Sequence, residues 1–228
     1  MERQVASDCR VANREHFPVL ARGHISQWSD SQLLGFILQQ RHSPQSSLHM
    51  ANQLLQELGS LHGVLNASQN VLCSVPGVGP KKYIRCQAIV ELHKRTSVQH
   101  VERMMKLDSV DESKAFFISQ LQYYQHECFA VVLLNSQHEF LHYRELFTGT
   151  INSASVYPRE IVKYVVDYNA ANVLISHNHP SGSPEPSQAD IAMTQKIVEA
   201  LGLIDVQVLD HIVVGVGNAV SLAQRGCL

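Results

Sequence analysis

Two histidines and an aspartate near residue 180 form a pattern that suits a metal ion. His177 and His179 flank a single residue where a short apolar run, 172–176, is expected to end as a buried strand. Asp190 follows in the first turn of the next expected helix, and the Pro/Gly-rich loop between them can bring its carboxylate back to the imidazoles. Two His ligands and one carboxylate leave a coordination position open, which is typical of a catalytic zinc site.

Each part of this pattern also has an interpretation without a metal. A His-x-His pair at the end of a strand is often only a polar loop. Ser187-x-x-Asp190 in front of an apolar run is also a capping box, in which the two residues satisfy backbone N–H groups. The metal interpretation accounts for two histidines, a rigid loop and a carboxylate together, so we favour it.

The remaining sequence predicts two units of different character. Before residue 100 the apolar periodicity indicates helices only, at 30–38, 48–58, 60–65, 68–72 and 80–94. In the last of these, Ile84, Ala88, Ile89 and Leu92 share one face. After residue 100, helices and strands are mixed, with helices at 110–125, 157–168 and 187–200 and strands at 128–134, 138–147, 172–176, 206–214 and 219–222. We therefore predict an α+β protein, helical over 1–100 and α/β over 101–228.

Composition narrows the class of protein. The chain has 228 residues and a net charge of −2. Residues 1–100 carry ten Lys/Arg and six Asp/Glu, whereas residues 101–228 carry eight and fourteen, which suggests units with different partners. The five cysteines are scattered without CxxC spacing, and no apolar run reaches the roughly 20 residues that span a bilayer. We expect a cytoplasmic protein with no membrane partner.

The residues around the histidine pair resemble a known family. His177-x-His179-Pro180 followed by Ser187-x-x-Asp190 resembles the JAMM motif of the MPN/JAB zinc metallopeptidases, and its extended form, HNHPSG, resembles the bacterial RadC family, UPF0758. Further matches lie at 147–152 (FTGTIN), 158–160 (PRE) and 210–215 (DHIVVG). The resemblance covers nearly the whole chain. It implies a helix-hairpin-helix segment followed by an MPN domain of cytidine-deaminase-like α/β fold, with Zn²⁺ as cofactor.

The family also implies a catalytic glutamate on the strand after the first helix of the MPN domain. Glu127 occupies that place, directly before the apolar run 128–134. Glu160, in the first turn of a helix, and Glu139, in the second strand, are alternatives. We prefer Glu127 because a charge at the head of a buried strand needs a special reason.

The mechanism that follows is hydrolysis of a peptide or isopeptide bond in a protein or peptide substrate. Zinc held by His177, His179 and Asp190 would acidify a water, and Glu127 would take its proton and pass it to the leaving amine. Ser187, by similarity to the motif, would stabilise the oxyanion, or act only as a helix cap.

A second motif lies in the helical unit. The stretch 72–82, LCSVPGVGPKK, resembles the hairpin of a helix-hairpin-helix module, in which Gly77 and Gly79 would expose N–H groups to a DNA phosphate. The basic residues that would add charge without reading sequence are Lys81, Lys82 and Arg85. The pattern departs from such modules at Tyr83, where a small residue is usual. Non-specific DNA contact through residues 72–95 is one interpretation, and a purely structural hairpin is the other.

Two classes of function therefore compete. The first is a zinc-dependent amide hydrolase. The second is a DNA-associated repair or recombination accessory, or an interaction module, without peptidase turnover of its own. An intact set of metal ligands favours the first, because a scaffold does not need an open metal site.

Overall fold

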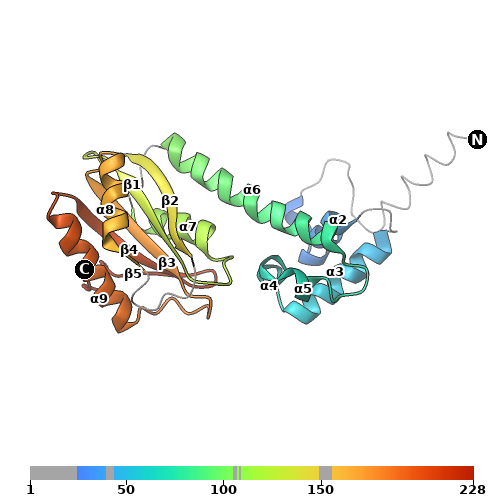
Figure 1. Cartoon of the computed structure of the whole chain (residues 1–228). Coiled ribbons are helices and arrows are strands. Elements are labelled where there is room, and N and C mark those ends of the chain that lie inside the picture. The colour runs from blue at the N-terminus through green and yellow to red at the C-terminus, as the bar shows by residue number, and fades with distance from the viewer. Residues whose placement is uncertain (1–24, 40–43, 105–106, 108, 149–155) are drawn as a thin grey trace, which may run out of the picture. The chain divides into compact units, whose positions relative to one another are not determined.

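A computed structural model describes residues 25–39, 44–104, 107, 109–148 and 156–228 (Figure 1). The stretch at 147–152 that resembles the RadC family lies outside these residues from position 149 onward. The chain divides into two compact units, residues 1–91 and 92–228. The first is helical and the second mixes helices with a sheet, so the predicted α+β class is confirmed. The division between units falls inside one helix, as does the predicted domain boundary after residue 100.

Three of the helices in the helical unit begin at serine caps. A 3₁₀ turn, η1 (Ile25–Gln27), precedes α2 (Asp30–Leu38), α3 (Pro44–Leu58), α4 (Leu61–Asn66), α5 (Gln69–Leu72) and the start of α6 (Pro80–Met104). Ser29, Ser60 and Ser68 each accept a hydrogen bond from an N–H of the helix that follows, which satisfies one of its unpaired donors. Their apolar faces form one core with Leu34, Leu38, Ala51, Leu54, Val64, Leu72 and Cys86.

Helix α6 is longer than predicted, and its most apolar stripe is not the one that it buries. It continues ten residues beyond the expected end at 94, to Met104. Its buried residues are Lys82, Cys86, Val90 and Val101, whereas Ile84 is 62% and Leu92 is 63% exposed. The stripe that lines the core at the start of the helix therefore includes a cysteine and a lysine.

That lysine is Lys82, one of the candidates for DNA contact. Its side chain is 3% exposed, and its ammonium group donates a hydrogen bond to the Gly77 carbonyl at 2.7 Å. Gly77 has a φ of +84°, a conformation that a side chain would strain. Arg85 donates to the carbonyls of Ile37 and Gln39 at 3.1 and 2.7 Å. Both cations therefore stabilise the fold of the unit, and the neighbouring Lys81 is exposed.

The second unit is a five-stranded mixed sheet in the order β2-β1-β3-β4-β5. The strands are β1 (Cys128–Leu134), β2 (Phe140–Thr148), β3 (Asn172–Asn178), β4 (Gln207–Val214) and β5 (Ala219–Ser221). Strands β3 and β4 are parallel, and the other pairs are antiparallel. Every residue of β1 is buried, which explains its continuous apolar sequence.

Helices cover both faces of the sheet. On one face α8 (Pro158–Asp167) and α9 (Gln188–Gly202) pack against Phe129, Val131 and Leu133. On the other face α7 (Val110–Leu121) packs against the alternate residues Cys128, Ala130, Val132 and Leu134. Two apolar cores therefore use the two-residue period of a single strand. Among the described residues, no helix combines the length and the apolar composition needed to cross a membrane.

Strand β3, helix α9 and strand β4 form a βαβ unit that positions the polar residues noted above. The carboxyl end of β3 carries His177, and the loop that follows leads to the first turn of α9. In open α/β sheets, ligands bind outside the carboxyl ends of strands at such crossovers. This topology brings His177 and Asp190 to one edge of the sheet.

We predict that Lys82→Met destabilises the helical unit by about 1.5–3 kcal/mol, because it removes the charged hydrogen-bond donor to the Gly77 carbonyl. Lys81→Met, at the neighbouring exposed position, serves as the control and changes stability by less than about 0.5 kcal/mol. Denaturant unfolding of both variants measures the difference. Equal stability of the two variants would contradict the structural role of Lys82.

Candidate metal centre

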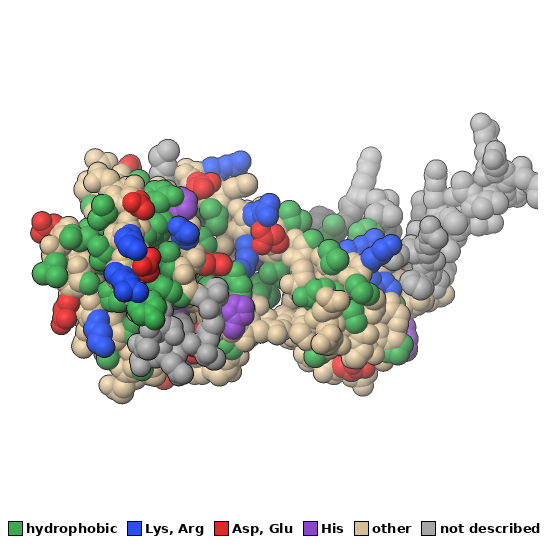
Figure 2. Space-filling view, in the orientation of Figure 1, with side chains coloured by type: hydrophobic (Ala, Val, Ile, Leu, Met, Phe, Trp, Pro, Cys, Tyr) green, Lys and Arg blue, Asp and Glu red, His purple; other side chains and the backbone are tan. Residues whose placement is uncertain are grey.

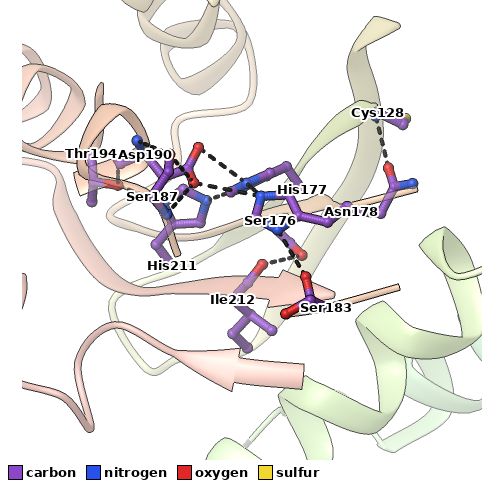
Figure 3. Close-up of polar contacts among 11 residues, drawn as sticks. Cys128, Ser176, His177, Asn178, Ser183, Ser187, Asp190, Thr194, His211 and Ile212 are labelled. Atoms are coloured by element: carbon purple, nitrogen blue, oxygen red, sulfur yellow. Dashed lines mark hydrogen bonds and ion pairs between the residues drawn. The ribbon is translucent and has the colours of Figure 1, made fainter. Parts of the chain in front are cut away.

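Three side chains converge on one point at the carboxyl end of β3. Two of them, His177 and Asp190, are labelled in Figure 3, where they point toward each other. The three side chains are His177 at the end of β3, His179 just beyond it and Asp190 in the first turn of α9, and their donor atoms lie within 4.8 Å of one another. The two Nε2 atoms are 3.0 Å apart. Asp190 Oδ1 lies 3.3 Å from His177 Nε2, and Asp190 Oδ2 lies 3.5 Å from His179 Nε2.

These separations fit the coordination sphere of a small divalent ion. Bonds of about 2.0–2.2 Å at tetrahedral angles place neighbouring ligand atoms about 3.3–3.5 Å apart. The three observed separations span 3.0–3.5 Å. Two imidazoles and one carboxylate are also the donor set found in catalytic zinc sites with an open position. The residues could therefore hold zinc without a large rearrangement.

The hydrogen bond of His179 fixes which ring nitrogen is available. Its Nδ1 lies 2.9 Å from the backbone carbonyl of Ser183, which can only accept a hydrogen bond. Nδ1 therefore carries the proton, and the neutral ring presents the lone pair of Nε2 to the centre of the cluster.

A chain of hydrogen bonds through Thr194 and His211 fixes, in the same way, which ring nitrogen of His177 is available. The Thr194 hydroxyl donates to the Asp190 carbonyl at 2.6 Å, so it must accept from His211 Nδ1, 2.5 Å away. His211 is then protonated at Nδ1 and accepts through Nε2 from His177 Nδ1 at 2.8 Å. The neutral His177 ring consequently also presents its Nε2 lone pair to the cluster. The two histidines and the carboxylate thus direct three electron-rich atoms at one another.

The pKa values reflect this crowding. Burial alone would raise the pKa of Asp190, but the adjacent imidazoles of His177 and His179 outweigh burial and hold that pKa well below its usual range. The neighbouring carboxylate of Asp190 is in turn the largest of the effects that raise the pKa of His179. Burial holds the pKa of His211 well below 6.5, which keeps that ring neutral, as the hydrogen-bond chain requires. In this structure the cluster therefore attracts a positive charge, which either a proton or a metal ion can supply.

The loop between His179 and α9 is held by close backbone contacts. The N–H of His179 donates to Val214 O, and the N–H of Val216 donates to Gly182 O, at 2.8 and 3.0 Å. A side chain at Gly215 would collide with that Gly182 carbonyl. The loop is therefore fastened to the end of β4, as a rigid His179 ligand requires.

Ser187 begins α9 as a complete capping box. Its hydroxyl accepts from the N–H of Asp190 at 3.2 Å and donates to Asp190 Oδ2 at 2.6 Å, while its own N–H also donates to Oδ2 at 2.7 Å. The predicted cap is confirmed. In this arrangement Ser187 orients the carboxylate of Asp190, and its role toward a substrate oxyanion stays a prediction.

Glu127, the predicted base, lies at the end of the sheet where the histidines lie. It precedes β1, and Phe129 of β1 pairs with His177 across the sheet. The negative charge of Glu127 contributes to the raised pKa of His179, so the carboxylate lies within electrostatic reach of that ring. Its role as a base stays a prediction that this location favours.

The two alternative glutamates have other surroundings. Glu139 accepts a hydrogen bond from Asn135, whose carbonyl accepts from Asn172 at the opposite end of β3 from the histidines. Glu160 pairs with Lys163 at 3.0 Å and with Arg159 at 3.6 Å on the exposed side of α8.

Sequence reasoning missed two polar residues that support the cluster, and for His211 and Asp210 it favoured a satisfied pair in the core over support of the site. His211 contacts a ligand histidine, whereas its neighbour Asp210 is satisfied by the N–H groups of His211 and Ala223 and by the Ser221 hydroxyl. Thr194 was missed, although it lies one helical turn after Asp190. Asn178, between the two histidines, was also missed, although a buried polar residue in a strand needs partners.

Comparison with known proteins agrees with this geometry. A family model described as RadC-like JAB domain matches residues 107–227, and one described as UPF0758 N-terminal matches residues 19–84. The chain belongs to the RadC (UPF0758) family. A UPF0758 protein of Marinomonas sp. strain MWYL1 is 46% identical over 198 residues, which are 87% of this chain and 88% of the relative. UPF0758 proteins of Tolumonas auensis and Shewanella frigidimarina are 45% and 43% identical over 92% and 93% of this chain and 93% of each relative.

We predict that His211→Ala lowers the affinity of this RadC-family protein for Zn²⁺ by roughly 10–100-fold. Without the acceptor at His211, the proton of the His177 ring can lie on either nitrogen, so Nε2 is no longer reserved for the metal. His142→Ala, at a partly buried histidine that contacts Tyr164 on α8, is the matched control and leaves the affinity unchanged. Competition with a chelator at fixed pH measures both. Unchanged affinity in His211→Ala would show that the hydrogen-bond chain does not prepare the ligand.

Proposed function

We propose that this protein is a zinc-dependent hydrolase of peptide or isopeptide bonds. The observation that carries the proposal is the convergence of two imidazoles and one carboxylate, with separations of 3.0–3.5 Å. Glu127 directly precedes the strand that pairs with β3, at the end where the histidines lie. Membership of a family with a JAB domain supports the same class of activity. The substrate is a protein or peptide.

His177, His179 and Asp190 would hold the ion through the atoms described above. When bound, zinc would polarise the scissile carbonyl and lower the pKa of a water toward about 7. The hydrogen bonds at the two Nδ1 atoms direct both Nε2 atoms at the ion, and the lowered pKa of Asp190 favours its carboxylate form.

Glu127 supplies the proton transfer. Its carboxylate takes a proton from the attacking water, whose oxygen bonds to the carbonyl carbon of the amide. As the C–N bond breaks, Glu127 returns that proton to the nitrogen, so the products are an amine and a carboxylic acid, which then loses the second proton of the water to solvent. Ser187 donates its hydroxyl to the oxyanion in this proposal, which requires the hydroxyl to turn away from Asp190.

Glu127→Gln tests the base. Glutamine keeps the size of the side chain and cannot accept the proton, so we expect zinc to remain bound while hydrolysis falls by roughly 10²–10⁴-fold. The measurement combines elemental analysis with kcat/KM on any peptide or isopeptide that the wild-type protein cleaves.

Glu160→Gln is the matched control for this experiment, because it makes the same change at the start of α8 and removes only exposed ion pairs. We expect its turnover to equal that of the wild type. Loss of turnover in Glu160→Gln, with normal rates in Glu127→Gln, would show that the base is Glu160 and that the assignment of Glu127 is wrong. A wild-type protein that binds zinc and cleaves no amide would refute the hydrolase proposal.

We propose DNA contact by the helical unit as a separate activity. The observation in its favour is the exposed start of α6, where Lys81 is exposed and a side chain at Gly79 would contact nothing within 4 Å. Figure 2 shows Lys and Arg side chains gathered on part of this unit, whereas acidic and basic side chains alternate over the other unit. The internal bonds of Lys82 and Arg85 narrow the candidates for phosphate contact to Lys81 and the backbone of 77–81.

We predict that Lys81→Glu weakens binding to double-stranded DNA equally for all sequences and reduces the slope of log K against log[salt] by about 1. Lys196→Glu, which makes the same charge change at an exposed position of α9, leaves binding unchanged. Fluorescence anisotropy between low and physiological salt measures both slopes. Absence of binding by the wild-type protein at low salt would make the hairpin purely structural.

A further inference from the structure

We propose that Asn178 is a positioning residue that holds Glu127 in place beside the ligand cluster. The inference rests on the proposed hydrolase function for the role of Glu127, and on hydrogen bonds in the structure for the role of Asn178. It gives a reason for an asparagine, in particular, between the two ligand histidines.

The Asn178 side chain lies on the opposite face of the sheet from the two histidines. It is 2% exposed and is the last residue of β3. Figure 3 shows its amide directed toward Cys128 and away from Asp190. Because successive side chains of a strand point to opposite faces, the sequence His-Asn-His places two ligands on one side and one amide on the other.

Three hydrogen bonds connect this amide to the segment that carries Glu127. Asn178 Oδ1 accepts from the N–H of Cys128 at 2.8 Å. Asn178 Nδ2 donates to the carbonyls of His126 and Tyr124 at 3.1 and 3.2 Å. The residues immediately before and after Glu127 are therefore both held by one buried side chain.

These bonds continue the sheet beyond its last backbone pair. The pairing of β1 with β3 ends at Phe129 and His177, so the next position would place Cys128 opposite Asn178. At that position the side-chain amide of Asn178 forms the hydrogen bonds that a paired backbone would otherwise form. The task needs one acceptor and two donors on one short planar group, which asparagine supplies and aspartate, serine or an apolar residue does not.

The other end of the segment is fastened independently. The Tyr124 hydroxyl donates to Glu145 Oε2 at 2.5 Å, and Lys94 Nζ lies 3.9 Å from the centre of the Tyr124 ring and 3.6 Å from Glu145 Oε1. Loss of the Asn178 amide therefore releases the backbone around Glu127 while Tyr124 stays anchored. A general base that moves by about 1 Å can cost about 10²-fold in rate.

The experiment compares Asn178→Ala with Asn172→Ala. Asn172 is 7% exposed at the opposite end of the same strand, where its amide donates to the Asn135 carbonyl at 2.9 Å. The control therefore also removes a buried asparagine amide from β3, far from the cluster. Both proteins are studied as full-length chains.

The first readout is backbone amide exchange, which does not require turnover. We expect Asn178→Ala to speed exchange of the Cys128 amide by roughly 10-fold or more, because one hydrogen bond is lost and the segment opens locally. Asn172→Ala leaves that amide unchanged. Normal protection of Cys128 in Asn178→Ala would overturn the proposal whatever the activity.

The second readout is a double-mutant cycle with Glu127→Gln, with zinc content checked in each variant. We expect Asn178→Ala to lower kcat by about 10–100-fold with zinc retained, and to add less than about 3-fold in the Glu127→Gln background, because it acts through Glu127. An equal loss in both backgrounds would make Asn178 a general structural residue and overturn the proposal. If the wild-type protein cleaves no amide, the hydrolase proposal fails, and the exchange result alone decides whether Asn178 holds the segment.

Discussion

The main constraint on the second unit is that it must hold three electron-rich atoms together at the carboxyl end of β3. His177, His179 and Asp190 would repel one another if nothing fixed their lone pairs and nothing positive lay among them. The outward-facing nitrogen of each imidazole is tied down instead, to His211 in one case and to the Ser183 carbonyl in the other. Ser187 holds the carboxylate in the same way from the start of α9. The packed sheet and helices around the cluster offset the repulsion among these three atoms. A rigid βαβ unit is therefore a suitable support for the cluster.

The two-residue period of β3 organises the site as well as the core. Residues on one face join the core under α8 and α9 and end with His177, whereas residues on the other face join the core under α7 and end with Asn178. A shift of pairing by one residue would exchange the faces, and the ligands would then point toward α7. The register that buries the apolar side chains of β1 and β3 therefore also decides where the ligands point.

Sequence reasoning found the parts of this site that have a local signature. The spacing of His177, His179 and Asp190 predicts a common point because a strand, a short loop and a helix start leave few other geometries. Asn178 was missed because its partners are backbone groups that lie about fifty residues away in sequence, and Thr194 was missed because its side-chain partner, His211, lies on another element. The burial of Lys82 on α6 has a related reason: hydropathy cannot show that its ammonium group has the Gly77 carbonyl to bond. Local sequence patterns thus predict the candidate metal ligands and the helices and strands. The supporting polar residues depend on tertiary hydrogen bonds, which such patterns do not show.

The internal use of Lys82 and Arg85 changes what the basic charge of the helical unit means. A count of Lys and Arg over residues 1–100 treats every cation as available to a phosphate. Two of the three cations near the hairpin instead cap backbone carbonyls, of Gly77 and of Ile37 and Gln39, and so serve as anchors within the unit. A hairpin stabilised in this way keeps its turn preformed without any nucleic acid. The shape of the hairpin is therefore explained by the stability of the helical unit. Only the exposed residues at its tip are informative about a partner.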